Sequence, residues 1–381
     1  MTHHSNIGRD DRLAGIWDQG VDVTLPKDGF NVALLGVGRI GVMHARLLVD
    51  HPLVGRLVLA DLNHDKANRI AAELGCESSG IDEVFGAGNP LELDGLVIAT
   101  GTSAHSELLV RSAESGLPVY CEKPIALTLA EARKAQEALE RSRVPHHIGF
   151  QRRFDDGYNR AKQLLESGGL GELRRFHAMT CDQFPPADDF IAGSGGIFLD
   201  CNVHDFDILR WLTGREVVEV YATGSARGSR AFADSGDFSD SVAVLTFDDG
   251  TVGSVHASRY NGQGHEVRLD LMGSEGSANV GLDNKAPLRS VEDDVTYPPD
   301  EPWSDFIERF KPCYERELDH FLRNPVRGLP GSCTASDAVE ALRIALACNK
   351  SRDEHRPVRL DEITLSGGGT RFSGERCQRL E

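Results

Sequence analysis

The chain has 381 residues and a formal net charge of -18, with 40% hydrophobic and 26% charged residues. A chain of this length usually folds around more than one hydrophobic core, so two domains are expected. The composition is that of a globular protein rather than a disordered one. The acidic balance argues against nucleic acid or an anionic membrane surface as a partner, because both repel a negative protein. A small anionic cofactor stays compatible with it, because a few local cations and backbone N–H groups can hold phosphates.

The sequence contains no apolar run long enough to span a bilayer, and its polar extension at 1–29 lacks the apolar core of a signal peptide. The 8 cysteines are scattered, and no pair of them has CxxC spacing. Such scatter is typical of reduced thiols in a cytosolic protein and speaks against a zinc site. We therefore expect a cytoplasmic protein that binds no metal.

The first half of the chain, residues 30–150, alternates between short apolar runs and longer amphipathic segments. The apolar runs predict strands at 30–35, 57–60, 96–99, 119–121 and 147–150. The segments between them predict helices at 42–49, 66–74, 106–115 and 128–141. Strands that alternate with helices in this way indicate a parallel sheet with helices on both faces. We therefore predict a doubly wound α/β domain over residues 30–150.

A glycine-rich turn, Gly36-Val37-Gly38-Arg39-Ile40-Gly41, follows the first predicted strand and opens the first helix. Gly36 would permit the tight turn, Gly38 would let the backbone approach a pyrophosphate, and Gly41 would let helix and strand pack closely. The N–H groups at the start of the helix would bind the phosphates. A bare GxGxxG is weak evidence, but this one lies between a strand and a helix, as a dinucleotide site requires. The turn predicts a Rossmann-type domain.

Asp61 ends the second predicted strand, 20 residues after Gly41. A carboxylate at this place accepts hydrogen bonds from the adenosine ribose hydroxyls and repels a 2′-phosphate, which favours NAD over NADP. Asn63 and Asp65 lie in the same loop, so a helix cap is the alternative interpretation of Asp61. We predict NAD as the cofactor.

Glu122-Lys123-Pro124 comes directly after the strand at 119–121. Ligands bind at the carboxyl edge of an open α/β sheet, where this tripeptide should lie. A lone Glu-Lys-Pro is more often a solvated turn, and spacing alone leaves both interpretations open.

The second half of the chain, residues 151–363, has a different pattern. Its helices are predicted at 156–167, 200–212, 302–323 and 334–351. Its strands are predicted at 173–180, 217–223, 241–247, 251–258 and 265–272, with Asp249-Gly250 as a hairpin turn between two of them. We predict an α+β domain with a large open, mostly antiparallel sheet. The tail at 364–381 is rich in Gly, Ser and Arg and is expected to be loose.

Asp200 and His204 are four residues apart and should lie on one face of the helix at 200–212. Oxidation of an alcohol needs a base that takes the hydroxyl proton as the hydride leaves, and a histidine kept neutral by a nearby lysine suits this role. Asp200 would orient the imidazole or bind a substrate hydroxyl. The alternative makes Asp200 a helix N-cap and His204 a packing residue.

At these residues the sequence resembles the Gfo/Idh/MocA oxidoreductases, over about residues 30–357. The resemblance rests on the glycine turn and on segments 100–105, 122–124, 149–154, 200–207 and 309–318. It implies Lys123, Asp200 and His204 as the catalytic trio of a sugar or polyol dehydrogenase. It also implies that Arg152 lies near the cofactor, and that the open sheet builds a dimer or tetramer.

The predicted contacts of both ligands follow from the motifs and the resemblance together. Those of the cofactor are Gly36, Gly38, Arg39, Ile40, Gly41, Asp61, Thr100, His105, Glu122, Lys123 and Arg152. Those of the polyol or sugar substrate are Lys123, Asp182, Asp200, Asn202 and His204.

Segment 195–211 is most similar to the myo-inositol 2-dehydrogenase branch of the family, so an inositol-like polyol is the first expected substrate. Segment 181–186 departs from that branch, which leaves a nucleotide-sugar or aldose dehydrogenase as the alternative. A dinucleotide-sensing regulator without catalysis is the third hypothesis. It predicts loss of Lys123 or His204, and both are present.

Overall fold

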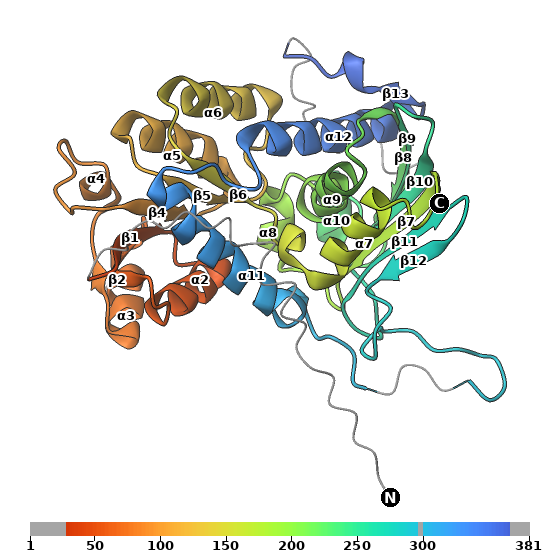
Figure 1. The fold of residues 1–381 in the computed structure, drawn as a ribbon, viewed down its shortest axis with the longest axis horizontal. Helices are drawn as coiled ribbons and strands as arrows, with labels where there is room; N and C mark the ends of the chain where they lie inside the picture. The colour runs from red at the N-terminus through yellow and green to blue at the C-terminus, as the bar shows by residue number, and fades with distance from the viewer. Residues whose placement is uncertain (1–27, 296–299, 366–381) are drawn as a thin grey trace, which may run out of the picture.

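The computed structural model describes residues 28–295 and 300–365. They form two sheets, each packed with helices, that lie beside each other and share a continuous hydrophobic core (Figure 1). The extension predicted at 1–29 and the tail predicted at 364–381 fall almost wholly outside the described residues. The boundary placed at residue 150 stays a prediction.

The first sheet contains six parallel strands in the order β3-β2-β1-β4-β5-β6. They are β1 Phe30–Leu35, β2 Val54–Ala60, β3 Glu77–Ser78, β4 Gly95–Ile98, β5 Val119–Glu122 and β6 His146–Gly149. The order reverses between β1 and β4, and the carboxyl edge at this switch point is where open α/β sheets bind ligands. The doubly wound domain is therefore confirmed. Strand β3, an exposed two-residue edge strand, was not predicted.

The helices of this half are α2 Arg39–Val49, α3 His64–Leu74, α4 Ile81–Val84, α5 Thr102–Ser115 and α6 Leu129–Ser142. Helix α2 begins three residues earlier than predicted, because Gly38 is its N-cap. Alternate residues of β1 enter two separate cores, Val32 and Leu34 on one face and Ala33 and Leu35 on the other. Both faces of the sheet are thus covered, as a parallel sheet requires.

The second sheet contains seven strands in the order β12-β11-β7-β10-β9-β8-β13. They are β7 Leu173–Cys181, β8 Val217–Ser225, β9 Asp240–Phe247, β10 Val252–Ser258, β11 Glu266–Gly273, β12 Ser277–Val280 and β13 Val358–Arg359. Strands β7 and β10 pair in parallel, and every other neighbouring pair is antiparallel. The predicted open, mostly antiparallel sheet is confirmed, and the hairpin predicted at Asp249-Gly250 joins β9 to β10. Strands β12 and β13 were not predicted.

The helices of this half are α7 Asp156–Glu166, α8 Asp188–Gly193, α9 Val203–Thr213, α10 Arg230–Asp234, α11 Phe306–Arg323 and α12 Ala335–Glu354. Short 3-10 turns lie at Gln151–Phe154, Pro325–Arg327 and Leu360–Glu362. Helices α8 and α10 were not predicted. In Figure 1, α12 runs across the molecule from beside α6 to the second sheet, so it packs on both halves.

A π-helical turn, Phe198–Asn202, precedes α9 where a regular helix from Asp200 was expected. The chain enters it through Gly195 and Gly196, whose φ angles of 81° and 92° favour glycine. The backbone N–H of Ile197 donates to Asp237 Oδ1 at 2.9 Å, which fixes the start of the turn. Single π turns occur frequently at functional sites. This one carries Asp200 toward the first sheet.

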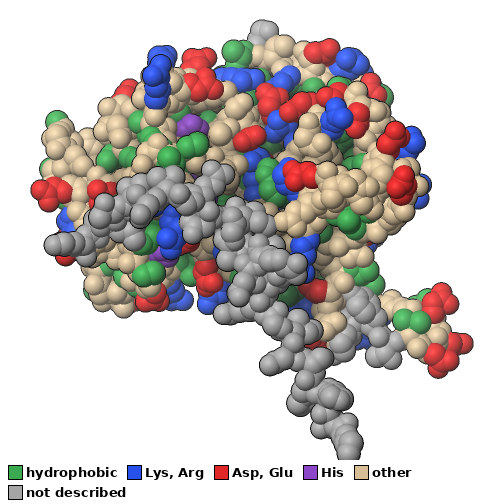
Figure 2. All heavy atoms as spheres, viewed as in Figure 1, with side chains coloured by type: hydrophobic (Ala, Val, Ile, Leu, Met, Phe, Trp, Pro, Cys, Tyr) green, Lys and Arg blue, Asp and Glu red, His purple; other side chains and the backbone are tan. Residues whose placement is uncertain are grey.

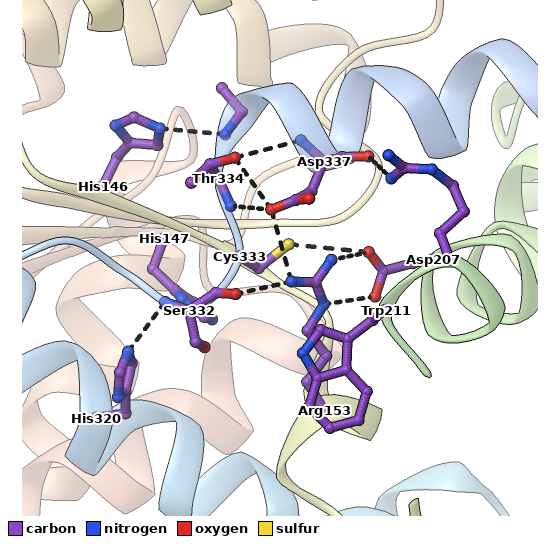
Figure 3. A network of polar contacts seen from close by, with 12 residues as sticks. His146, His147, Arg153, Asp207, Trp211, His320, Ser332, Cys333, Thr334 and Asp337 are labelled. Atoms are coloured by element: carbon purple, nitrogen blue, oxygen red, sulfur yellow. Dashed lines mark hydrogen bonds and ion pairs between the residues drawn. The ribbon is translucent and has the colours of Figure 1, made fainter. Parts of the chain in front are cut away.

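A polar network centred on Arg153 lies beside β6 (Figure 3), and it reaches the first half at His146, whose Nε2 accepts from the Ala335 N–H at 3.1 Å. Arg153, just after β6, donates to both carboxylate oxygens of Asp207 on α9, with N···O distances of 2.9 and 2.5 Å. It also donates to the carbonyl of Ser332 at 2.7 Å and lies 3.5 Å from Asp337 on α12. Arg153 and Asp207 are 3% and 1% exposed, so the ion pair at the centre of the network is almost fully desolvated.

On the face seen in Figure 2, acidic and basic side chains are interspersed rather than gathered in fields of one sign. Within residues 28–295 and 300–365, no helix combines the length and the apolar character that crossing a membrane requires.

Candidate active site

The glycine turn after β1 forms a cradle whose shape depends on its glycines. Gly36 has a φ of 95°, and a Cβ there would lie 2.7 Å from the Ala99 carbonyl oxygen. A Cβ on Gly41 would lie 1.9 Å from the Gly36 carbonyl oxygen, so the turn and helix pack too closely for any side chain. A Cβ on Gly38 would meet nothing within 4 Å, which leaves open space over the turn. The three predicted roles agree with this geometry.

The start of helix α2 suits an anionic ligand. Its N-cap, Gly38, has no side chain to occupy the free N–H groups, and its first turn contains no acidic residue. Arg39 is exposed and its guanidinium lies 4.9 Å from the ring centroid of Phe306, while Ile40 is half-buried. These residues fit the pyrophosphate of a dinucleotide.

Asp61 contacts the glycine turn directly. Its Oδ2 accepts a hydrogen bond from the backbone N–H of Val37 at 2.8 Å, and its Oδ1 accepts from that of Asn63. The cap of α3 is Asn63, whose side chain accepts from the backbone N–H of Lys66. The alternative that Asp61 caps this helix is therefore wrong. Asp61 stays half-exposed beside the cradle, where a ribose would lie.

His105 lies behind the cradle rather than in it. Its ring nitrogens lie 2.8 Å from the carbonyl oxygen of Pro124 and 3.1 Å from that of Thr100. The side chain is 1% exposed, and burial lowers the pKa of its imidazole. His105 thus braces the turns that follow β4 and β5, while Thr100 is half-exposed. That these two residues contact the cofactor stays a prediction.

Glu122 is the buried anchor of the Glu-Lys-Pro turn. Its Oε1 lies 2.7 Å from His44 Nε2 and accepts from the Tyr120 hydroxyl at 3.1 Å. Burial raises the pKa of this carboxyl, but the hydrogen bond and charge of His44 and the charge of Lys123 outweigh it, so the pKa is lowered. The carboxylate fixes the backbone that presents Lys123. Its predicted cofactor contact is not tested by this geometry.

Lys123 and Asp200 meet across the two halves of the molecule. Lys123 Nζ donates to the backbone carbonyl of Asp200 at 2.8 Å and to its Oδ1 at 3.2 Å. Arg259 Nη2 donates to the other oxygen, Oδ2, at 2.6 Å. Burial raises the pKa of Asp200, but the two cations outweigh it and hold this pKa far below its ordinary value. The side chains of Lys123 and Asp200 are 17% and 16% exposed, so each presents a face to the site.

His204 follows the π turn and lies against Phe150, with their ring centroids 5.8 Å apart. Burial is the main cause that lowers its pKa well below the ordinary value, and the charges of Lys123, Arg152 and His265 add to it. The imidazole is therefore neutral at neutral pH, as predicted. The expectation that Asp200 orients the imidazole does not hold here, because Lys123 and Arg259 engage both carboxylate oxygens.

Arg152 and Asn202 lie under the site. Arg152 donates to Asp205 Oδ1 at 2.5 Å and to the Thr180 hydroxyl at 2.8 Å. Asn202 donates to Asp205 Oδ2 at 3.2 Å and accepts from Ser241 at 2.9 Å. Since Arg152 is 2% and Asn202 0% exposed, both position α9 against the second sheet. Their predicted contacts with cofactor and substrate stay predictions.

Asp182 has two partners that the sequence did not indicate. Arg259 Nη1 donates to its Oδ2 at 2.9 Å, and His265 Nδ1 lies 3.3 Å from its Oδ1. Arg259 follows β10 directly. Its place immediately after a predicted strand is the signal that could have identified it. The parallel pairing of β10 with β7, the strand that Asp182 follows, was not visible in the sequence.

The buried histidines predict that the protein is less stable at acid pH. Burial lowers the pKa of His105, His146, His147 and His204, and lowers that of His320 to about 4. These rings stay neutral in the folded chain and bind protons when unfolded below about pH 6.5, so each removes up to about 1.4 kcal/mol of stability per pH unit. Burial lowers the pKa of His256 as well. The carboxyls whose pKa burial raises, Glu317, Asp205, Asp237 and Glu266, act in the opposite direction but are four groups against six.

Thermal denaturation between pH 7.5 and 5 should therefore show a midpoint that falls with pH, most steeply below 6.5. A midpoint that stays constant or rises over this interval would contradict this prediction.

Among the described residues, no group of three or more His, Cys, Asp or Glu side chains could hold a metal ion.

Comparison with known proteins identifies the family. Residues 30–150 match the model of an oxidoreductase family with an NAD-binding Rossmann fold, and residues 158–279 match a GFO/IDH/MocA C-terminal domain. The chain is 34% identical over 333 residues to scyllo-inositol 2-dehydrogenase (NAD(+)) of Bacillus subtilis, covering 86% of this chain and 96% of that protein. It is 32% identical to myo-inositol 2-dehydrogenase of Thermotoga maritima, covering 87% and 99%.

Among solved structures, a myo-inositol dehydrogenase from Corynebacterium glutamicum superposes with a TM-score of 0.78 at 33% identity, over 87% of this chain and 99% of that one. The fold, the glycine cradle beside Asp61, and the Lys123–Asp200 pair beside a neutral His204 all agree with these matches. The chain belongs to the Gfo/Idh/MocA family of NAD-binding oxidoreductases.

Proposed function

We propose that this protein is an NAD-dependent dehydrogenase that oxidises a secondary alcohol of a cyclic polyol or sugar, with an inositol-like polyol first. The observation that carries the proposal is the meeting of Lys123 and Asp200 beside His204, at the carboxyl edge of the nucleotide-binding sheet. Such a cation, anion and neutral base beside a hydride acceptor suit the oxidation of a neutral alcohol.

Each of the three side chains has a distinct task. Bound NAD would accept the hydride from the carbinol carbon. His204 takes the hydroxyl proton, since its low pKa leaves it neutral and ready to accept. We assign this to Nε2, the ring nitrogen that lies farther from the backbone. Lys123 donates a hydrogen bond to the reacting oxygen, and Asp200 holds Lys123 and accepts from a substrate hydroxyl.

The relatives support an inositol-like substrate, since those compared above are named inositol dehydrogenases. Segment 181–186 departs from the inositol branch of the family. Within it, Asp182 is paired with the Arg259 guanidinium, a contact that the resemblance to that branch does not explain. A nucleotide sugar or an aldose is therefore the second candidate substrate.

The test is an absorbance assay at the reduced-nicotinamide band, with NAD and a panel of inositols, pyranoses and nucleotide sugars. Reduction with at least one cyclic polyol is expected, and Lys123→Ala provides the blank. Reduction with nucleotide sugars alone would favour the second candidate. No reduction with any alcohol would leave the dinucleotide-sensing regulator as the better hypothesis.

Asp61→Ala should weaken the preference for NAD over NADP. The carboxylate accepts from ribose hydroxyls and repels a 2′-phosphate, so its loss should lower the ratio of kcat/KM for the two cofactors by about 10- to 100-fold. Asn63→Ala is the matched control, because it removes the helix cap in the same loop and leaves Asp61 in place. A wild-type protein that works faster with NADP would contradict the role of Asp61.

We also propose a cytoplasmic homo-oligomer, a dimer or tetramer, assembled through the outer face of the second sheet. That face presents Tyr221, Val242, Val244 and Val252, which are 36–46% exposed. Adjacent apolar side chains on an uncovered sheet favour association. The mass in solution is the measurement that decides it.

A further inference from the structure

Three neighbouring strands of the second sheet bring polar residues to one edge. Cys181, the last residue of β7, pairs with Ser258, the last residue of β10, and with Glu266, the first of β11. The residues just beyond these ends are Asp182, Arg259 and His265. The parallel pairing of β7 with β10 is what places Asp182 and Arg259 side by side.

Arg259 joins this edge to the catalytic residues. It donates to Asp182 Oδ2 at 2.9 Å and to Asp200 Oδ2 at 2.6 Å, so one guanidinium holds both carboxylates. The backbone of Asp182 is also fixed, because its N–H donates to the Ser258 carbonyl and its carbonyl accepts from the Asn261 N–H, both at 2.8 Å. Asp182 is therefore a rigid, oriented acceptor in the site.

His265 lies on the other side of Asp182. Its backbone N–H donates to the Trp303 carbonyl at 2.7 Å, and its ring centroid is 6.4 Å from that of Phe306. The same Phe306 ring lies under Arg39 of the glycine cradle, so Phe306 links His265 to the cradle. His265 is among the groups whose charge lowers the pKa of His204, so the two rings lie close enough to interact.

Both ring nitrogens of His265 are enclosed, and among the described residues neither has a hydrogen-bond partner of good geometry; Nδ1 makes only a close polar contact with Asp182 Oδ1 at 3.3 Å. The residue is 2% exposed. A buried polar atom without a partner costs about 1–3 kcal/mol, and such atoms in native proteins commonly wait for a ligand or water. The carboxylate of Asp182 can only accept, so in the tautomer that turns an N–H toward it, the proton lies on Nδ1 and Nε2 is left as an acceptor.

We propose that His265 is a specificity-determining residue, whose Nε2 accepts a hydrogen bond from a substrate hydroxyl on a carbon other than the one oxidised. Asp182 orients the ring, and Arg259 binds both Asp182 and Asp200, which fixes the two carboxylates relative to each other. The proposal rests on the proposed function, because it needs a polyhydroxylated substrate. It gives the site a second point of attachment, which a simple alcohol does not use.

The experiment compares wild-type protein with His265→Leu, using the best cyclic polyol of the panel and its mono-deoxy analogues. With the full polyol, kcat/KM should fall about 10- to 100-fold in the variant, mainly through KM, as expected for one lost hydrogen bond. With the analogue that lacks the contacted hydroxyl, wild-type and variant proteins should give equal kcat/KM. His265→Gln, which keeps an acceptor, should recover part of the loss.

NAD affinity and the thermal midpoint of each variant check that the cradle and the fold persist. His51→Leu, at the opposite edge of the nucleotide sheet, is the matched control and should behave as wild type. An equal loss with every analogue, or no loss, would overturn the role of His265 alone. A wild-type protein that oxidises no polyol would overturn the proposed function and this inference with it.

Discussion

Replacing His204 with Ala should lower kcat by about 10²- to 10⁴-fold, which is the usual contribution of a general base. The imidazole is buried beside Lys123 and is neutral, so its removal takes away the group that accepts the hydroxyl proton. NAD affinity should change little, because the glycine cradle and Asp61 lie on β1, α2 and β2. Steady-state rates and a calorimetric titration with NAD measure the two effects separately.

Chemical rescue distinguishes a lost base from a disturbed fold. Added imidazole can enter the space left by the side chain, so it should restore part of the rate of His204→Ala and leave the wild-type rate unchanged. A variant with wild-type-like turnover would reject the role of His204. Loss of NAD affinity in parallel with kcat would instead indicate structural damage.

The second large effect concerns stability. Asp207→Ala should destabilise the folded protein by about 3–5 kcal/mol, because it leaves Arg153 as a buried charge without its carboxylate. The two residues share a pair of hydrogen bonds, and both are almost completely buried (Figure 3). Denaturant unfolding followed by circular dichroism measures the loss.

The pair Arg230–Asp234 offers a matched comparison, because it is also ionic but its side chains are 89% and 64% exposed. Asp234→Ala should change stability little. The double variant Arg153→Met/Asp207→Leu should be more stable than Asp207→Ala, since no charge is left unpaired. If Asp207→Ala and Asp234→Ala were equally stable, Arg153 and Asp207 would not form the desolvated pair described above.

The first domain could be predicted well, because its signals are local. The glycine turn, Asp61 and the alternation of apolar runs all lie within a few residues of the structure that they specify. The second sheet was harder to predict. Strands β7 and β10 are separated by about seventy residues, and their parallel register depends on packing with helices rather than on any turn between them. The strand positions were visible and their neighbours were not.

The prediction of the site divides in the same way, into local motifs that were identified and long-range contacts that were not. Lys123, Asp200 and His204 were predicted together, and the structure brings Lys123 to Asp200. The supposed Asp200–His204 partnership failed, because i,i+4 spacing describes a regular helix and ignores cations from other strands. Arg259 competes for that carboxylate from the end of β10. Arg259 and His265 belong to no local motif, and only the sheet topology gathers them.

Helix α11 completes a core that begins at Phe30, almost three hundred residues earlier in the chain. Its Leu318, Phe321 and Leu322 pack in one cluster with Val97 of β4 and Tyr120 of β5. A chain growing on the ribosome therefore cannot close its nucleotide domain when residue 150 has been made. That apolar face stays exposed until residue 323 has emerged, so the interval is long and open to aggregation. A fragment cut at residue 150 should need α11 supplied separately in order to fold.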